Sequence, residues 1–313
     1  MHDILDIVVK KPLPITLATI IQTEGSSYQK AGAMMAFDKN GEQIGMLSGG
    51  CIEEELSHYV NDLSPNKWAT KEIDMTEDSW FSEAGCYGVL YVLLETVDET
   101  VQEFLRRVVM YIDAGLSVKI VKHLGKSETL CICENGHHFG NWQGEVEKVK
   151  HVREGLHGSM YVQTILPRPR LIIFGAGEDA KPLVLLAKQN GFSITISDWR
   201  ESLCTPRRFP EADHFFIGFP SEIFHQLAIQ KKDFVVMMTH HLERDEELLR
   251  LLSKEPCRYV GILGSKERKT RLFAQIKEPE WVFSPVGLSI GARGPNEIAV
   301  SIMGEIIQQL RKA

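Results

Sequence analysis

The sequence has no uninterrupted apolar run long enough to cross a bilayer, so no transmembrane helix is expected among its 313 residues. It also lacks, at its amino end, the basic segment and apolar stretch that mark a secretory signal. We therefore expect a cytoplasmic protein with no membrane partner. Positive charge is not in excess either, because the net charge is −7 and Lys and Arg are mostly dispersed. Nucleic acid is accordingly not an expected partner.

Cysteine is scarce, at six residues, and none of them has the C-x-x-C spacing that is typical of zinc and iron–sulfur sites. We expect no metal site, and free thiols rather than a disulfide framework. Cys131 and Cys133 alternate along an expected strand, so both side chains point to one face. Core packing accounts for this pair.

The most informative stretch of the first half lies between residues 47 and 56. An apolar strand is expected to end at Ser48-Gly49-Gly50, with Cys51 on the first turn of a helix that runs to about Val60. Two glycines allow successive N–H groups to point into one concavity, and the helix adds the positive end of its dipole. This pattern predicts an anion-binding corner that holds a thiol of lowered pKa. The alternative is a glycine-rich turn with a buried structural cysteine.

Two further features of the first half surround this corner. A buried strand over 14–23 leads into the small-residue loop Gly25-Ser26-Ser27, and Lys39-Asn40-Gly41 between apolar runs predicts a hairpin over 33–47. A second glycine-flanked cysteine, Cys86, precedes the buried strand 89–96. The hairpin sends its second strand directly into the predicted corner.

Pro167-Arg168-Pro169 predicts a domain boundary, which divides the chain into domains 1–166 and 167–313. Directly after it, a short apolar strand leads into Gly175 and Gly177, with Ala180 in the third position of a G-x-G-x-x-A pattern. A helix, a strand and Asp198 follow. This order is the dinucleotide-binding fingerprint in its expected context, so it predicts a Rossmann-like, doubly wound α/β domain. Glu178 and Asp179 would, however, repel a phosphate at the helix N-terminus.

Further strand-and-helix units of the second half also end in polar residues. His240 follows one expected strand, and Ser265 and Arg268 follow another. Because ligands of doubly wound sheets bind at the carboxyl ends of the strands, these side chains and Asp198 are candidates for one site. The alternative for His240 is capping and solvent contact.

Several unusual strings occur in a fixed order along nearly the whole chain. They are Gly25-Ser26-Ser27, Ser48-Gly49-Gly50-Cys51-Ile52-Glu53, Gly85-Cys86-Tyr87-Gly88 before a strand that contains Glu95, Phe174-Gly175-Ala176-Gly177, Thr239-His240, Gly264-Ser265-Lys266 and Gly287-Leu288-Ser289-Ile290-Gly291-Ala292. On these strings the chain resembles the XdhC/CoxI family, the accessory proteins of xanthine dehydrogenase and related molybdenum hydroxylases. The chain departs from the family pattern at Tyr28, Tyr87 and Ser289.

The resemblance implies a mixed α+β amino-terminal domain before the Rossmann-like domain. It also implies an accessory protein that binds molybdenum cofactor, protects it during sulfuration and delivers it to apo xanthine dehydrogenase or a related hydroxylase in purine catabolism. A cysteine desulfurase is a further implied partner, and a homodimer is our default expectation. The candidate cofactor-binding residues are Gly25, Ser26, Ser27, Ser48, Gly49, Gly50, Cys51, Glu53, Cys86, Gly175, Gly177, Asp198, His240, Ser265 and Arg268. Cys51 is also the candidate for a sulfur or metal contact.

Two other functions compete with this expectation. The first is an NAD(P)-dependent oxidoreductase that holds its dinucleotide at Gly175, Gly177 and Asp198. The second is xanthine dehydrogenase itself, which is excluded because the chain is too short and lacks cysteines at iron–sulfur spacing. The accessory protein is therefore expected to be a cofactor-insertion chaperone rather than an enzyme.

Overall fold

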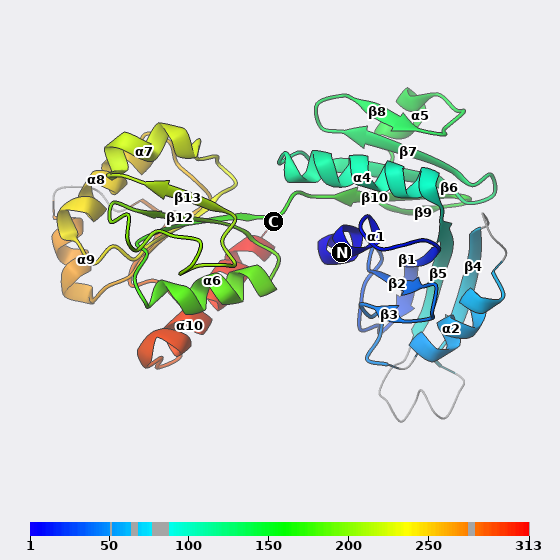
Figure 1. The fold of residues 1–313 in the computed structure, drawn as a ribbon, viewed down its shortest axis with the longest axis horizontal. Helices are drawn as coiled ribbons and strands as arrows, with labels where there is room; N and C mark the ends of the chain where they lie inside the picture. Colours follow the sequence, from blue (N-terminus) through cyan, green and yellow to red (C-terminus); the bar gives the residue numbers. More distant parts are fainter. Residues whose placement is uncertain (51, 64–67, 77–87, 275–278, 313) are drawn as a thin grey trace. The chain divides into compact units, whose positions relative to one another are not determined.

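The computed structural model describes residues 1–50, 52–63, 68–76, 88–274 and 279–312. The chain forms two compact units, Met1–Pro167 and Arg168–Ala313 (Figure 1). The first unit is built on antiparallel sheets and the second on a parallel sheet with helices on both faces, which confirms the predicted fold class. Within the described residues, no helix is both long enough and apolar enough to cross a membrane.

The first sheet of the amino-terminal unit has the strand order β3-β2-β1-β5-β4, and all its pairs are antiparallel. Its strands are β1 (Ile15–Gly25), β2 (Met34–Asp38), β3 (Gln43–Ile44), β4 (Trp68–Asp74) and β5 (Gly88–Val97). The predicted hairpin is confirmed, since Ala36 pairs with Ile44. Its second strand ends earlier than expected, because Gly45 has a φ of 81° and leaves the extended conformation.

The second sheet has the order β8-β7-β6-β10-β9 and is also antiparallel. Its strands are β6 (Val118–His123), β7 (Glu128–Cys133), β8 (His138–Gly140), β9 (Gly155–His157) and β10 (Met160–Ile165). The helices of this unit are α1 (His2–Val8), α2 (Glu53–Asn61), α4 (Glu99–Asp113) and α5 (Val146–Lys150). Asp98 caps α4, because its carboxylate accepts the N–H of Val101 at 2.8 Å.

The two sheets of this unit share one core with α1 and α4. Leu17 of β1, Ile120 of β6 and Leu105 of α4 are all buried in it. Cys131 and Cys133 belong to the same core as buried free thiols, and burial raises the pKa of each thiol, so the predicted packing role is confirmed. On its other face, the first sheet packs against Leu56 of α2 in a separate core.

The carboxyl-terminal unit contains a six-stranded parallel sheet in the order β13-β12-β11-β14-β15-β16. Its strands are β11 (Arg170–Phe174), β12 (Ser193–Asp198), β13 (His214–Ile217), β14 (Phe234–Met237), β15 (Tyr259–Ile262) and β16 (Val282–Phe283). Its helices are α6 (Ala180–Gln189), α7 (Pro220–Leu227), α8 (Leu242–Leu252), α9 (Lys266–Leu272) and α10 (Gly294–Arg311). This strand order is that of the Rossmann fold, and the order reverses between β11 and β14.

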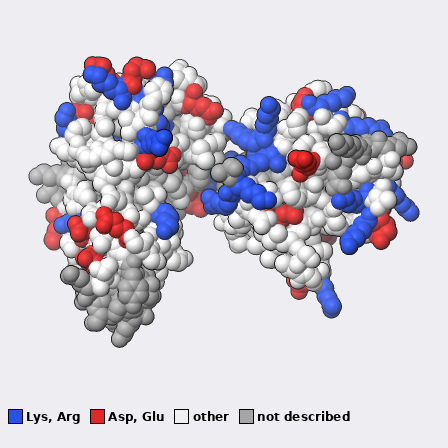
Figure 2. All heavy atoms as spheres, turned by 180° about the vertical axis from the view of Figure 1, so that it is seen from behind, with Lys and Arg blue, Asp and Glu red and all other residues white. Residues whose placement is uncertain are grey.

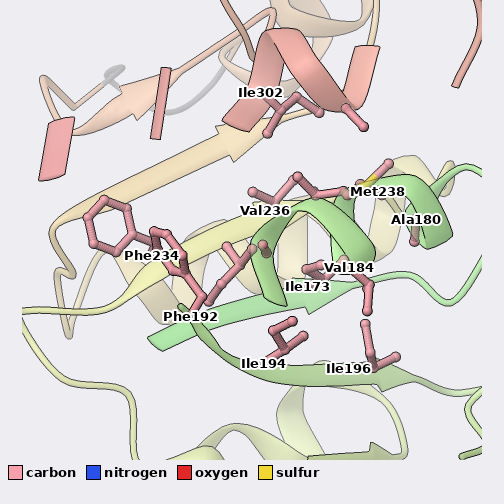
Figure 3. Packing of buried hydrophobic residues seen from close by; sticks show 14 of the residues in the cluster. Ile173, Ala180, Val184, Phe192, Ile194, Ile196, Phe234, Val236, Met238 and Ile302 are labelled. Atoms are coloured by element: carbon pink, nitrogen blue, oxygen red, sulfur yellow. The ribbon is translucent and has the colours of Figure 1, made fainter. Parts of the chain in front are cut away.

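Alternate residues of each central strand face two different cores. Ile173 and Val236 face α6 and α10, whereas Ile172 and Val235 face α7, α8 and α9. Figure 3 shows the first of these cores, in which Ile302 of α10 lies above the sheet. The apolar face of α10, which includes Ile302 and Ile306, therefore packs on this unit's own sheet.

Two arginines form hydrogen bonds at the edge of the parallel sheet where the strands begin, opposite the edge formed by their carboxyl ends. Arg170 binds the buried Asp233 and the carbonyl of Leu227, and Arg258 donates to carbonyls at the end of α10. In the view of Figure 2, the densest group of Lys and Arg lies on the carboxyl-terminal unit, whereas both signs of charge are mixed on the amino-terminal unit.

Candidate functional site

The loops that follow β11 and β14 meet at the carboxyl edge of the parallel sheet. Gly175 has a φ of 115°, and a Cβ atom there would lie 2.3 Å from the carbonyl oxygen of Met238. Only glycine satisfies both conditions, since it tolerates positive φ and leaves room for the neighbouring backbone. The close contact places the glycine loop beside Thr239 and His240, at the point where the strand order reverses.

We expect the Gly175→Ala variant to lose more than about 2 kcal/mol of unfolding free energy, because it combines backbone strain with a clash against backbone. Gly136→Ala is the matched control, since Gly136 also has a positive φ, of 87°, but has nothing within 4 Å of its Cβ position. The measurement is urea unfolding followed by circular dichroism. Equal losses in the two variants would show that the contact with Met238 adds nothing.

Asp198, at the end of β12, is fully engaged by the protein's own groups. It accepts the backbone N–H of Ala176 at 2.7 Å and both Nε and Nη2 of Arg200, at 2.9 and 2.8 Å. Burial raises the pKa of this carboxyl, but the hydrogen bonds from Arg200 and Ala176 outweigh burial, so the pKa is lowered overall. A carboxylate held in this way is not free to receive a ribose hydroxyl.

His240 lies over the glycine loop in an unusual backbone conformation. Its φ is 57°, which is rare for residues other than glycine, and its Nε2 lies 2.7 Å from Oδ2 of Asp179. The His240 side chain is 62% exposed, so it remains accessible to a ligand at the edge of the sheet. Strained residues of this kind cluster at functional sites, which favours the site interpretation over simple capping.

Asp245 of α8 lies in the next layer of the same edge. Its buried carboxylate accepts Oγ1 of Thr239 and Nη2 of Arg268, each at 2.5 Å. Burial raises the pKa of Asp245, and the hydrogen bonds only partly offset that effect. Ser265 caps α9 by accepting the N–H of Arg268 at 3.3 Å, so its position has a structural explanation.

The glycine loop is a poor fit for the pyrophosphate of a dinucleotide. Asp179 is the N-cap residue of α6, and Glu178 precedes it, so two carboxylates occupy the end of the helix where a phosphate would bind. The N–H of Ala176 already donates to Asp198, and the N–H of Ala180 is directed at the carbonyl of Gly177 at 3.3 Å. The Rossmann fold is therefore present, while Asp198 takes one N–H group of its usual phosphate cradle and Asp179 lies at the N-terminus of the helix.

Side chains of the chain itself accept several N–H groups of the amino-terminal corner, which the sequence predicts to be an anion-binding site. Glu53 is buried and accepts the N–H groups of Leu47 and Ser48, at 2.9 and 2.7 Å, and the Ser48 hydroxyl at 2.5 Å. Ser48 Oγ in turn accepts the N–H groups of Gly50 and Ile52, each at 3.2 Å. In the described residues the helix α2 begins at Glu53, whose carboxylate folds back over the turn.

Burial raises the pKa of Glu53, but the hydrogen bonds from Ser48 and Leu47 outweigh it, so the pKa lies below its ordinary value of 4.5. Glu53 therefore contributes stability above pH 4.5, which is lost as the pH falls through its pKa in the folded protein. We expect Glu53→Gln to cost about 1–3 kcal/mol at neutral pH and to flatten the acid limb of the stability profile. Urea unfolding at several pH values measures both effects. Glu54→Gln, an exposed neighbour on the same helical turn, should leave the profile unchanged.

The loop Gly25-Ser26-Ser27 lies against the start of β5. A Cβ atom on Gly88 would approach the carbonyl oxygens of Glu24 and Ser26 to 2.4 and 2.6 Å, so this position requires glycine. The structure thus brings the string Gly25-Ser26-Ser27 into contact with Gly88, the last residue of the string over 85–88. Cys51, Cys86 and Tyr87 lie outside the described residues, and Gly49 and Gly50 have open space at their Cβ positions.

Three residues of these sites are not among the candidates that the sequence indicates. Asp179 is expected from the sequence only as an obstacle to phosphate, and neither Arg200 nor Asp245 is selected by any motif. A signal exists for Arg200, because an arginine two residues after the strand-end acid can fold back onto it. Asp245 gives no signal, since it lies on a helix among other acids. The described residues contain no group of three or more His, Cys, Asp or Glu side chains that could hold a metal ion.

The fold and these sites define a two-unit protein whose Rossmann unit presents a polar strand edge but not an open dinucleotide cradle. Residues 171–306 match the XdhC Rossmann domain, residues 9–63 match the XdhC and CoxI family, and residues 99–166 match the BH1974-like, central domain. A relative from Bacillus subtilis (strain 168), named as a probable subunit of xanthine dehydrogenase, is 39% identical over an alignment of 323 positions, and the match covers 99% of this chain and 98% of that protein. The chain belongs to the XdhC and CoxI family.

Two other similar proteins extend this comparison. A crystal structure described as a xanthine dehydrogenase from Bacillus halodurans has a TM-score of 0.92 and 41% identity, and the match covers 99% of this chain and 95% of that one. The molybdenum cofactor insertion chaperone PaoD of Escherichia coli (strain K12) is 22% identical over 299 residues, covering 93% of this chain and 81% of that protein.

Proposed function

We propose that this chain binds molybdenum cofactor as cargo, protects it during sulfuration and delivers it to apo xanthine dehydrogenase or a related molybdenum hydroxylase. The observation that carries the proposal is the match to a named cofactor insertion chaperone over 93% of the chain. The engagement of Asp198 by Ala176 and Arg200 supports it further, because a dinucleotide-dependent enzyme would need this carboxylate for the ribose. The protein acts as a carrier and not as a catalyst.

The strand edge supplies groups suited to such cargo. Arg200 is 42% exposed and His240 is 62% exposed, so each presents hydrogen-bond donors outward from the carboxyl edge. A cofactor that bears a phosphate needs donors of this type. Cys51 is the residue that we assign to the metal–sulfur end of the cargo, since thiolate is a soft ligand.

The experiment purifies the protein from cells that make the cofactor and measures the fluorescence of the pterin released on oxidation. The same preparation is then added to an apo-hydroxylase, and we expect hydroxylase activity to appear. Protein from a host unable to make the cofactor is the control and should not activate. Cys51→Ser should reduce retained cofactor or sulfuration, without abolishing the fold. No retained pterin together with tight NADH binding and hydride transfer would overturn the proposal in favour of an oxidoreductase.

A further inference from the structure

The amino-terminal unit contains a cavity of about 730 Å³ between its two sheets, which we call the inter-sheet cavity. Its walls come from β1 and β5 of the first sheet, from β6 and β10 of the second, and from α4. The volume falls within the range of roughly 300–1,000 Å³ that small-molecule sites occupy. None of the residues discussed above for the strand edge or the corner lines it.

A buried ion pair joins the two sheets inside this cavity. Glu95 of β5 and Lys122 of β6 bind each other directly, and their side chains are only 3% and 9% exposed. Removing two charges from water is costly, and a purely structural role would be served as well by apolar side chains of similar volume. The pair therefore calls for a further explanation, which a polar ligand in the cavity would provide.

The pair offers a specific pattern of hydrogen bonding. The two carboxylate oxygens of Glu95 accept hydrogen bonds, and the ammonium group of Lys122 beside them has two N–H groups beyond the one that binds Glu95. Taken in order from Oε1 through Oε2 of Glu95 to Nζ of Lys122, these atoms offer an acceptor, an acceptor and a donor. The complementary edge, donor, donor, acceptor, is the one that a 2-amino-4-oxopyrimidine ring presents through its amino group, its ring N–H and its oxo group.

The walls beside the pair suit a flat ring. Trp68 of β4 lines the cavity, and the Lys122 ammonium lies 5.0 Å from the centre of its ring. On the second sheet, Tyr161 donates to Oε1 of Gln163 at 3.3 Å, and Gln163 donates to the carbonyl of Gly32 at 3.0 Å. An aromatic face and a rigid polar wall are the usual setting for recognising a heterocycle.

We propose that the inter-sheet cavity binds a flat ring with a 2-amino-4-oxopyrimidine edge, which Glu95 and Lys122 recognise beside Trp68. Pterin and guanine both carry this edge. The pterin form rests on the proposed function and would place the ring of the cargo in the amino-terminal unit. The guanine form does not depend on it.

The test titrates the full chain, freed of bound pterin, with pterin, lumazine and guanosine, and follows Trp fluorescence and calorimetric heat. Lumazine is the matched ligand control, because it carries an oxo group in place of the 2-amino group and so faces the Glu95 carboxylate with an acceptor. We expect pterin to bind at least about ten-fold more tightly than lumazine, since one charge-assisted hydrogen bond is lost. Tight binding of guanosine without pterin binding would support the site and reject its pterin form.

Two variants separate this site from a fold effect. Glu95→Leu/Lys122→Met removes the recognising edge while filling the same space, and it should abolish the preference for pterin over lumazine. Trp68→Leu should weaken pterin binding at least about ten-fold. Trp142→Leu, a partly buried tryptophan of the same unit outside the cavity, should bind like the parent.

Several results would overturn the inference. They are a failure of all three rings to bind, an equal affinity for pterin and lumazine, or unchanged ring binding in the variant Glu95→Leu/Lys122→Met. If the double variant still retains cofactor and activates a hydroxylase, this cavity is not the binding site of the ring, and the proposed function remains intact. Loss of activation in all preparations, with ring binding preserved, would reject the proposed function and leave the cavity assignment standing.

Discussion

Replacing Lys122 with Met should lower the free energy of unfolding by about 3–5 kcal/mol, one of the largest effects expected for a single change in this protein. Met keeps most of the volume of the lysine stem, so little of the loss comes from packing. The cost arises because the carboxylate of Glu95, which is 3% exposed, is left buried without its cation. Chemical denaturation at neutral pH, monitored by circular dichroism, measures the loss.

The double variant Glu95→Leu/Lys122→Met tests this explanation. If the uncompensated charge is the cause, removing both charges should recover most of the stability that the single variant loses. Lys126→Met, at an exposed position in the turn after β6, is the control and should change stability by no more than about 0.5 kcal/mol. A double variant as unstable as Lys122→Met would mean that the lysine acts through packing or another partner.

The Glu95–Lys122 pair also shows where sequence reasoning stops. The Rossmann unit is predictable from local patterns, since the strand before Gly175, the glycine spacing and the strand-end Asp198 lie within 30 residues of one another. Glu95 and Lys122 meet only because two separate sheets pack face to face, and neither strand carries a signal for that packing. A site made by such packing cannot be obtained from motifs.

The corner at Ser48 shows a different limit. The glycines correctly predict a tight turn before a helix. The side chains that accept hydrogen bonds from the N–H groups of this turn belong to the same string of residues, 48–53. What the sequence does not specify is that Glu53 folds back and fills the turn, because a carboxylate in the first helical turn can equally point to solvent. Local competition between the protein's own acceptors and an outside anion is decided by geometry and burial.

Arg268→Met should produce the second large effect, again about 3–5 kcal/mol at neutral pH. Asp245 is 1% exposed, and the guanidinium of Arg268 is the cation that its carboxylate contacts, at 2.5 Å. The pKa of Asp245 is already raised above 3.8 by burial, and the charge of Arg268 lowers it, so removing Arg268 raises it further. Lys266→Met, an exposed change on the same helix, is the matched control.

The direction of the pH dependence follows from that raised pKa. The folded protein binds the Asp245 proton more tightly than the unfolded chain does. The contribution of this carboxyl to the free energy of unfolding is therefore most favourable below pH 3.8, and it is lost as the pH rises through the pKa of Asp245 in the folded protein. The Arg268→Met defect should therefore be smaller at a pH below neutral than at neutral pH, because more of the carboxyl is then protonated and less buried charge needs a partner. Adding Asp245→Asn should recover part of the loss at neutral pH, because an amide can still accept the Thr239 hydroxyl. A defect of the same size at both pH values, unrelieved by Asp245→Asn, would mean that Arg268 supports the strand edge by packing and not by balancing the buried carboxylate.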